Sequence, residues 1–460
     1  MNPDKAEPLK VVAPELMQAE QLRMTGELPE SLRICFAYLD DHFEDVAALI
    51  LAGRILLDSK RLGAAQAMLK LATILMPESS LAWSDLGCCY QEGSDPIEGE
   101  ACFIKALARD PNNSFALNNL SQLYAVNAQP MKAINCADKA IRLDPNLQDS
   151  HYNRGLSLLQ LGNWAEGWKG FDSNLGMHKG RKERVYGIIP RWTGVEGLKL
   201  IVYGEQGLGD EIFFSSCMPD VMKKNEVFLE CDPRLKGLLE RSFGCKTFGT
   251  RFDKKVSWPL DYDIDAAVAI GSLPGFYRNK DADFPGTPFL KADPERRLMY
   301  RSLLKSLGDK KKVGISWTGG LKNTGTARRS LSLLEMMPIL RQDATFISLQ
   351  YKDTDEIKEI EKQGIKIHHW PYAIQSNDYD DTAALVAELD LVISVTQSAI
   401  HVAGGLGVPC WVLVPREPLW RYGLSGDKML WYNSVKLYRQ KKEWVHTISE
   451  VARDLRDLCK

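Results

Sequence analysis

The hydrophobic positions in the first third of the chain recur with a period of 34 residues. The period is marked by a set of prolines and a set of alanines, Pro77, Pro111 and Pro145, and Ala72, Ala106 and Ala140. Between the prolines, apolar residues fall at helical spacing. Proline ends each unit because it cannot continue the helical hydrogen-bond ladder. The pattern therefore predicts stacked pairs of antiparallel helices.

A period of this length is typical of tetratricopeptide repeats. One unit carries the expected residues in order, namely Trp83, Leu86, Gly87, Tyr90, Gly99, Phe103, Ala106 and Pro111. Small residues such as Gly87 are expected where two helices cross closely. We place repeats at 46–79, 80–113 and 114–147, a degenerate unit at 148–175, and a helical cap at 1–45.

Stacked repeats form a solenoid with a concave groove, which favours binding of a peptide or a protein partner. Asn118 and Asn119 are candidates for contact with an extended peptide backbone. They could equally be solvated residues on a helix face, and the repeats could instead brace the rest of the chain or mediate self-association.

After residue 175 the hydrophobic period changes. Residues 176–198 are rich in glycine and charge, and the basic run at 178–184 is expected to be a solvated linker. Short β-rich runs then alternate with helical stretches, which predicts parallel sheets. We expect one Rossmann-like domain at 199–305 and a second at 306–460. The predicted fold class is α + α/β, an α-solenoid followed by a pair of α/β domains.

Composition narrows the function classes. The net charge is −2 across 460 residues, so nothing in it favours nucleic acid as a partner. The N-terminus lacks a signal-peptide pattern and no window approaches a membrane span. Ten scattered cysteines form no C-x-x-C pair, and seven histidines form no ligand-spaced cluster. We expect a cytoplasmic protein with free thiols, no membrane insertion, and no metal.

The first candidate site follows the strand predicted at 199–203. Gly207 and Gly209 allow backbone to approach a ligand closely, and Asp210 and Glu211 open the next helix. The spacing G-x-x-G-x-G differs from the dinucleotide fingerprint. Glu230, about 20 residues on, could still bind a ribose, which keeps a dinucleotide-dependent oxidoreductase as an alternative. A carboxylate at a helix N-terminus can also be a simple cap.

The second candidate site lies in the last third of the chain. Thr396, Gln397 and Ser398 stand between a buried strand and a helix, where free N–H groups bind anions. Arg328 and Arg329 follow the strand at 313–317, and arginine matches phosphate oxygens. Together they indicate a diphosphate site. The alternatives are an ordinary helix cap and solvated arginines, and a lone helical histidine such as His401 is usually a packing residue.

The chain from about 46 to 460 resembles bacterial tetratricopeptide-repeat glycosyltransferases. Their catalytic part is similar to the lipopolysaccharide heptosyltransferases, which have the two-domain GT-B fold. The resemblance rests on the order of several stretches, GEQGLGDEIFF, GISWTGG followed by ARRSLSL, FISLQ, DTAALVAELDLVISV, HVAGGLGVPCWVLVP and WRYG. The layout is also similar, more distantly, to protein O-linked N-acetylglucosamine transferases.

The resemblance implies roles for individual residues. Asp210 matches the proposed catalytic base, Arg329 a basic residue on the donor phosphates, and His401 the histidine of the D-T-G-x-x-H stretch that holds the diphosphate. Here Thr396, Gln397 and Ser398 replace the first three residues of that stretch, which puts the donor sugar in doubt.

The resulting hypothesis is a metal-independent glycosyltransferase that uses a nucleoside diphosphate sugar as co-substrate and no cofactor. Asp210, with Glu211 as the second choice, would be the base, while Gly207, Gly209, Trp317, Thr318 and Gly319 would line the site. The acceptor would be a protein held by the repeats, such as a bacterial flagellin. Alternatives are a glycan or lipopolysaccharide acceptor, and a non-catalytic repeat scaffold with a degenerate transferase half. The last helix, at about 443–458, is expected to pack back across the first α/β half.

Overall fold

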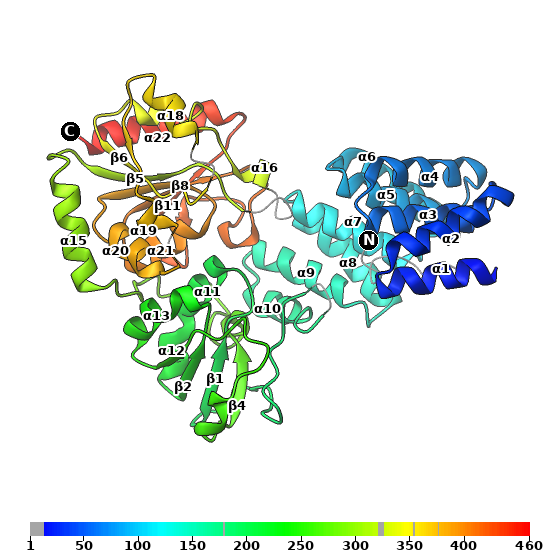
Figure 1. Cartoon of the computed structure of the whole chain (residues 1–460), viewed down its shortest axis with the longest axis horizontal. Helices are drawn as coiled ribbons and strands as arrows, with labels where there is room; N and C mark the ends of the chain where they lie inside the picture. Colours follow the sequence, from blue (N-terminus) through cyan, green and yellow to red (C-terminus); the bar gives the residue numbers. More distant parts are fainter. Residues whose placement is uncertain (1–12, 178–179, 321–325, 353–354, 376) are drawn as a thin grey trace. The chain divides into compact units, whose positions relative to one another are not determined.

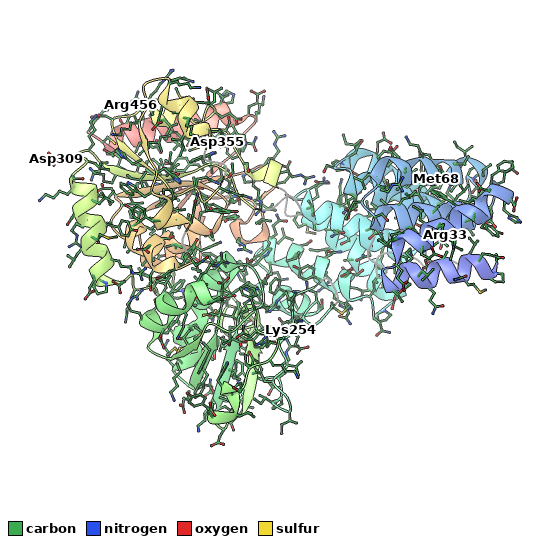
Figure 2. All side chains as sticks on the ribbon, in the orientation of Figure 1. Arg33, Met68, Lys254, Asp309, Asp355 and Arg456 are labelled. Atoms are coloured by element: carbon green, nitrogen blue, oxygen red, sulfur yellow. The ribbon has the colours of Figure 1, made fainter. Side chains whose placement is uncertain are left out.

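The computed structural model describes residues 13–177, 180–320, 326–352, 355–375 and 377–460. These residues fall into two compact units (Figure 1). One unit ends at residue 161 and includes residues 169–174. The other consists of residues 162–168 and the chain from residue 175 onward. Charged side chains such as Lys254, Asp309 and Arg456 are exposed at the surface (Figure 2).

The first unit is a series of antiparallel helix pairs. The helices are α1 Pro14–Thr25, α2 Leu28–Asp41, α3 Val46–Asp58, α4 Leu62–Leu75, α5 Ser80–Glu92, α6 Pro96–Arg109, α7 Ser114–Val126, α8 Pro130–Leu143, α9 Gln148–Gln160 and α10 Trp164–Asp172. Every second helix from α3 to α9 begins 34 residues after the previous one, at the start of each repeat placed from sequence. This architecture confirms the predicted α-solenoid of tetratricopeptide type.

The repeat period reappears in the local chemistry of the helix ends. The N-cap side chains of α3, α5 and α7 are Asp45, Ser79 and Asn113, each of which accepts a hydrogen bond from a backbone N–H three residues later. Such caps satisfy donors that a helix leaves free. The close crossing predicted at Gly87 is confirmed, because an added Cβ would lie 2.7 Å from the ring of Phe103.

Asn118 and Asn119 are buried in the solenoid, which overturns both interpretations of them. They are 0% and 1% exposed. The amide oxygen of Asn118 accepts hydrogen bonds from Ser150 at 2.9 Å and from Asn153 at 3.1 Å, so it joins α7 to α9. Asn119 donates to the sulfur of Cys88 at 3.2 Å. Burial of an amide requires such partners. Alanine at these positions would therefore report on folding rather than on a peptide groove.

The second unit contains two parallel sheets, which confirms the α/β part of the predicted fold class. In the described part of the chain the first sheet has the strand order β3-β2-β1-β4, with all pairs parallel. Its strands are β1 Lys199–Tyr203, β2 Glu226–Glu230, β3 Lys246–Phe248 and β4 Ala266–Ala269. The helices that accompany it are α11 Leu208–Phe214, α12 Met218–Met222, α13 Lys236–Phe243 and α14 Pro274–Tyr277.

The second sheet has the order β10-β11-β9-β8-β5-β6-β7, antiparallel only at the pair β10–β11. Its strands are β5 Lys312–Ser316, β6 Thr345–Ser348, β7 Ile367–His368, β8 Leu391–Val395, β9 Cys410–Val414, β10 Lys428–Met429 and β11 Tyr432–Arg439. Its helices are α15 Pro294–Lys305, α16 Thr326–Arg329, α17 Met337–Leu340, α18 Asp355–Glu361, α19 Pro371–Ile374, α20 Tyr379–Val386, α21 Ser398–Leu406 and α22 Trp444–Leu458.

The last helix occupies the predicted residues but not the predicted place. α22 packs against α17 and against β11 of the second sheet. Its buried side chains Ile448, Val451 and Leu455 join the core around Val313 and Ile393. The expectation that it crosses the first α/β half is therefore wrong, because its apolar face is covered by the sheet that precedes it.

The basic run at 178–184 is not a solvated linker in its described part; residues 178 and 179 lie outside the described residues. Arg181 is buried and forms an ion pair with Glu205 at 2.8 Å, and it also donates to Ser272 at 3.0 Å. Arg184 pairs with Glu230 at 2.9 Å. Because Glu205 follows β1 and Glu230 ends β2, this segment crosses the carboxyl end of the first sheet. A run of basic residues in a sequence does not show whether its side chains are solvated or are paired with buried carboxylates elsewhere in the chain.

Candidate functional site

The topology brings several predicted residues to equivalent places in the two sheets. In the first sheet β1 lies between β2 and β4, and in the second β5 lies between β6 and β8. The strand order reverses at β1 and at β5, because the chain continues to one side of each strand first and later to the other. Ligands of open α/β sheets bind beyond the carboxyl ends of the strands at such switch points. The loop after β1 carries Gly207, the loop after β5 carries Trp317, and the loop after β8 carries Thr396.

The glycine-rich loop brings α11 of the first sheet against α21 of the second (Figure 1). Gly207 is the N-cap of α11, and its N–H donates to the Oδ2 of Asp210 at 3.2 Å. A Cβ on Gly209 would lie 3.1 Å from the Cβ of Ser398. Gly209 thus allows the close approach that the sequence suggested, although the neighbour it meets is another helix.

Asp210 forms an ion pair that the sequence did not predict. Its Oδ1 accepts a hydrogen bond from the Nη2 of Arg421 at 2.7 Å, and the two side chains are 26% and 13% exposed. Burial alone would raise the pKa of the Asp210 carboxyl. The charge and hydrogen bond of Arg421 outweigh that effect, so the pKa lies below its usual value. Asp210 is therefore ionised and held by a cation.

His401 lies beside this pair as a neutral imidazole. Its Nε2 faces the Nη1 of Arg421 at 3.4 Å, and its Nδ1 lies 3.2 Å from the hydroxyl of Tyr432. Arginine only donates, so Nε2 must accept and Nδ1 carries the hydrogen. Burial lowers the pKa of His401 to about 3, and the charge of Arg421 acts in the same direction. His401 is thus both a packing residue and a neighbour of Arg421.

The side-chain amide of Gln350 holds the turn after β5 through hydrogen bonds. The Oε1 of Gln350 accepts from the backbone N–H groups of Trp317 and Thr318 at 3.3 and 3.2 Å. An added Cβ on Gly319 would lie 2.8 Å from the carbonyl oxygen of Thr396. The predicted residues after β5 and β8 are therefore in contact.

Two buried polar atoms near this contact have no hydrogen-bond partner among the described residues. They are the Nε1 of Trp317 and the Oγ1 of Thr396, which belong to side chains 0% and 2% exposed. Gln397 directs its amide to the hydroxyl of Ser316. Buried polar groups normally find partners, so each of these two atoms is an exception among the described residues.

The two predicted arginines differ in their surroundings. Arg328 is exposed. Arg329 is half-buried, and burial lowers its pKa. The charge of Arg421 lowers that pKa further, while Asp210 and Tyr422 raise it, which places Arg329 within electrostatic reach of the Asp210–Arg421 pair. Arg329 is therefore the more enclosed of the two and lies within electrostatic reach of this pair.

Two other carboxylates of the first α/β half, those of Glu211 and Glu230, are bound by residues other than Arg421. Glu211 is 1% exposed, accepts the N–H of Asp232 at 2.9 Å, and pairs with Arg251. Burial raises its pKa to about 7, against the effect of Arg251. Glu211 is therefore engaged by Arg251 and Asp232, whereas the carboxylate of Asp210 pairs with Arg421.

Glu230 is occupied as well. Its oxygens accept from Arg184 at 3.0 Å, from Tyr186 at 2.5 Å and from Thr250 at 2.6 Å, and it is fully buried. It has no free oxygen for a ribose, which removes the observation that supported an oxidoreductase.

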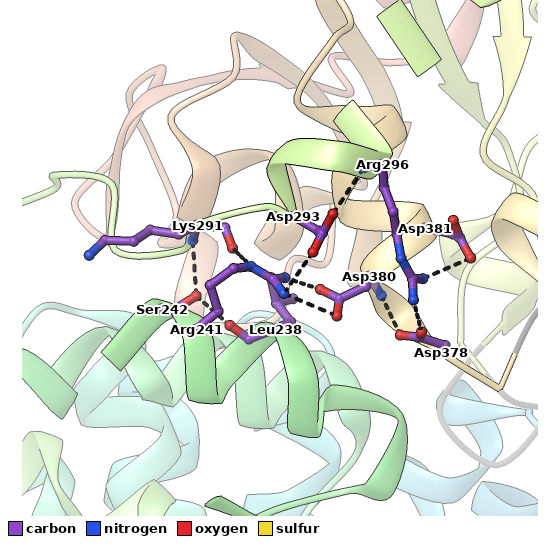
Figure 3. A network of polar contacts seen from close by, with 9 residues as sticks. All are labelled: Leu238, Arg241, Ser242, Lys291, Asp293, Arg296, Asp378, Asp380 and Asp381. Carbon is purple, nitrogen blue, oxygen red and sulfur yellow. Dashed lines mark hydrogen bonds and ion pairs between the residues drawn. The ribbon is translucent and has the colours of Figure 1, made fainter. Parts of the chain in front are cut away.

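A second set of contacts ties the two sheets together (Figure 3). Arg241 on α13 pairs with Asp380 on α20 and lies 3.6 Å from Asp293. The preceding residue of α20, Tyr379, donates to the Oγ of Ser398 at 3.2 Å. The start of α21 is therefore fixed from both sides, by Gly209 and by Tyr379.

An aromatic cluster backs Arg421. The guanidinium lies 4.7 Å from the ring centre of Phe213 and 5.4 Å from that of Trp420. Trp420 meets Trp168 edge to face at 5.4 Å, and the indole of Trp168 donates to the carbonyl of Arg278 at 2.7 Å. Cation–π contacts hold a guanidinium in place. Residues 162–168, placed from sequence in the degenerate repeat, thus contribute to the second unit.

Sequence reasoning missed several residues of the site. Arg421 stands in the stretch WRYG, which carries the resemblance without implying a role for the arginine, and Gln350 ends the stretch FISLQ. Tyr379 and Tyr432 gave no local signal. An arginine flanked by aromatic residues after a buried strand was the one pattern that could have been found.

Comparison with known proteins supports the repeats. A tetratricopeptide repeat family model matches residues 102–135. The chain is 30% identical over 331 residues to protein FlbA of Caulobacter vibrioides, a match that covers 67% of this chain and 55% of FlbA. The chain therefore spans little more than half the length of that relative.

Solved structures similar to this chain cover about a third of it. The crystal structure of MamA is 21% identical and covers 34% of this chain and 91% of MamA, with a TM-score of 0.30. YrrB, described as a TPR protein with an unusual peptide-binding site, is 18% identical and covers 35% and 84%, with a TM-score of 0.29. Scores this low carry no argument about function.

The chain thus contains a tetratricopeptide repeat region and continues into an α/β unit of two sheets, parallel apart from the pair β10–β11 in the described residues. Within its described residues, no helix has the length and apolar character needed to cross a bilayer. Nor do three histidine, cysteine, aspartate or glutamate side chains of those residues gather as metal ligands.

Proposed function

We propose that the α/β unit is a glycosyltransferase of GT-B type that uses a nucleoside diphosphate sugar. The observation that carries the proposal is the Asp210–Arg421 pair beside the N-terminus of α21. It joins a carboxylate of the first sheet to a cation of the second, and the neighbouring Gly209 contacts Ser398 at the start of α21. A transferase needs a base for the acceptor and positive charge for the leaving diphosphate.

The proposed reaction is a single displacement. The acceptor hydroxyl oxygen forms a bond to the anomeric carbon while its proton passes to Asp210. The bond from that carbon to the diphosphate oxygen breaks, and the electron pair leaves with the phosphate. Arg329, Arg421 and the N–H groups at the start of α21 stabilise the charge that develops there. Thr396, whose hydroxyl has no partner among the described residues, stands next to this helix and is a further candidate for the same ligand.

A panel of nucleotide sugars tests the proposal. The full chain is incubated with each nucleotide sugar and with a cell lysate that supplies candidate acceptors. The release of nucleoside diphosphate is then measured. We expect release with one donor, dependent on the acceptor fraction. Release with none of the donors, from a chain that binds a nucleoside diphosphate, would show that the unit is a binding module.

Substitution Arg329→Ala should weaken the binding of a nucleoside diphosphate far more than that of the nucleoside. Hydrogen bonds to charged groups contribute about 1.5–3 kcal/mol, which applies only to the ligand that carries phosphate. Titration calorimetry with both ligands measures the difference. Arg328→Ala is the matched control, because Arg328 is exposed beside it. Equal losses for both ligands would place Arg329 away from the phosphates.

We propose further that the acceptor is a protein recruited by the repeats, as in flagellin modification. An extended polypeptide suits a solenoid, and tethering raises the local acceptor concentration to roughly millimolar. Deletion of residues 1–147 should therefore weaken transfer mainly through acceptor affinity, while hydrolysis of the donor persists. Intact-mass analysis of proteins captured by the full chain measures the transfer. Equal modification of a glycan or lipid by the shortened chain would contradict this proposal.

A further inference from the structure

Arg421 makes few of the hydrogen bonds open to it. A guanidinium carries five N–H donors. One nitrogen binds Asp210 at 2.7 Å, and another faces the ring of His401 at the long distance of 3.4 Å. The Nε of Arg421 is buried, and no residue in the described ranges accepts a hydrogen bond from it. The side chain is therefore held in place with donor capacity to spare.

The surroundings of Arg421 contain more positive charge than its one carboxylate balances. Arg329 lies within electrostatic reach, and His401 is neutral. The first turn of α21 lies beside the glycine-rich loop through Gly209 and Ser398, and its N-cap residue Gln397 provides no side-chain cap in the described part of the chain. A ligand with several anionic oxygens fits this set of donors better than a single carboxylate does.

We propose that Arg421 exchanges partners, from Asp210 in the free protein to a diphosphate when one binds. Asp210 and the diphosphate then compete for one guanidinium, and arrival of the ligand releases the carboxylate. This inference rests on the proposed function in one respect, since the released carboxylate is the base that the transfer requires. A sugar nucleotide would thereby prepare the base, and the free protein would hold it idle.

Substitution of a binding-site residue usually weakens the binding of the ligand. The exchange of partners predicts the opposite for Asp210, namely tighter binding of a diphosphate. Removing the Asp210 charge frees Arg421 in advance, so a diphosphate no longer has to displace it. Any interaction broken on binding reduces the observed affinity by its own free energy. Asp210→Asn should therefore bind inorganic pyrophosphate more tightly than the unaltered chain does, by about tenfold if 1.4 kcal/mol of the pair is lost on binding.

Simple repulsion between the Asp210 carboxylate and an anion would also weaken binding, and a double-mutant cycle separates the two causes. If Arg421 is exchanged, Asp210→Asn tightens binding in the full chain but not in the Arg421→Ala background. If repulsion alone acts, the tightening is the same in both. Arg421→Lys provides a second background that keeps the charge and lacks the fork. Arg416→Ala is the control, an exposed arginine on the same segment.

The experiment is titration calorimetry of these full-length chains with pyrophosphate. The expected result is tightening by Asp210→Asn that depends on Arg421, and weaker binding for Arg421→Ala than for Arg416→Ala. Affinity unchanged by Asp210→Asn, tightening independent of Arg421, or no binding by any chain would each overturn the exchange. The chain could also show tighter binding that depends on Arg421 and yet transfer no sugar. That result would contradict the proposed function and would still support the exchange of partners.

Discussion

Substitution Asp210→Asn should lower the rate of sugar transfer by about 10²–10⁴-fold, the usual contribution of a general base. Asparagine has nearly the same shape and can still accept the N–H of Gly207 that caps α11. It cannot take a proton from an acceptor hydroxyl. Nucleotide binding should persist, so the loss appears in kcat. Initial rates of nucleoside diphosphate release at saturating donor measure it.

The pH dependence gives a second readout. The pKa of Asp210 lies below its usual value, so the base is present above that pKa and lost as the pH falls through it. The free protein should therefore keep kcat/KM down to low pH, since that ratio reports groups of the free enzyme. Asp309→Asn, an exposed aspartate, is the control and should match the unaltered chain. Activity of Asp210→Asn within about threefold of the control would exclude an essential base, given the size expected of one.

The solenoid was predictable because its determinants are local and repeated. Caps, small crossing residues and prolines recur every 34 residues, so each repeat supports the interpretation of the next. Asn118 and Asn119 were misjudged because nothing in a helical period distinguishes a polar residue on a groove from one buried between stacked helices. Their partners Ser150 and Asn153 lie a full repeat away.

The α/β unit was predicted in outline and missed in its long-range pairs. Alternating strands and helices indicated parallel sheets, and the switch points located the loops at Gly207, Trp317 and Thr396. Arg421 meets Asp210 across 211 positions of sequence, and no local pattern encodes such a contact. The strand β11 gave no clear signal, because YNSVKLYR is neither a continuous apolar run like the buried strands nor a regular alternation of polar and apolar residues.

The second large effect concerns the segment that the sequence presents as a linker. Arg181 and Glu205 form an ion pair whose side chains are 3% and 0% exposed. Removing one member of a buried pair leaves an uncompensated charge and costs about 3–5 kcal/mol. Substitution Arg181→Met should therefore destabilise the α/β unit by about that amount, although a solvated linker arginine would contribute almost nothing.

Urea unfolding followed by tryptophan fluorescence measures the effect, as a fall in the transition midpoint of the unit. Lys182→Met is the matched control, since Lys182 is the exposed neighbour in the same basic run. The double variant Arg181→Met with Glu205→Leu should recover most of the stability, because replacing a whole buried pair by apolar side chains is often neutral. Equal midpoints for Arg181→Met and Lys182→Met would return the segment to the status of a linker. A separation between them would mean that an α/β fragment cut at residue 199 lacks part of its own fold, and that fragments used to test the proposed activity must begin upstream of Arg181.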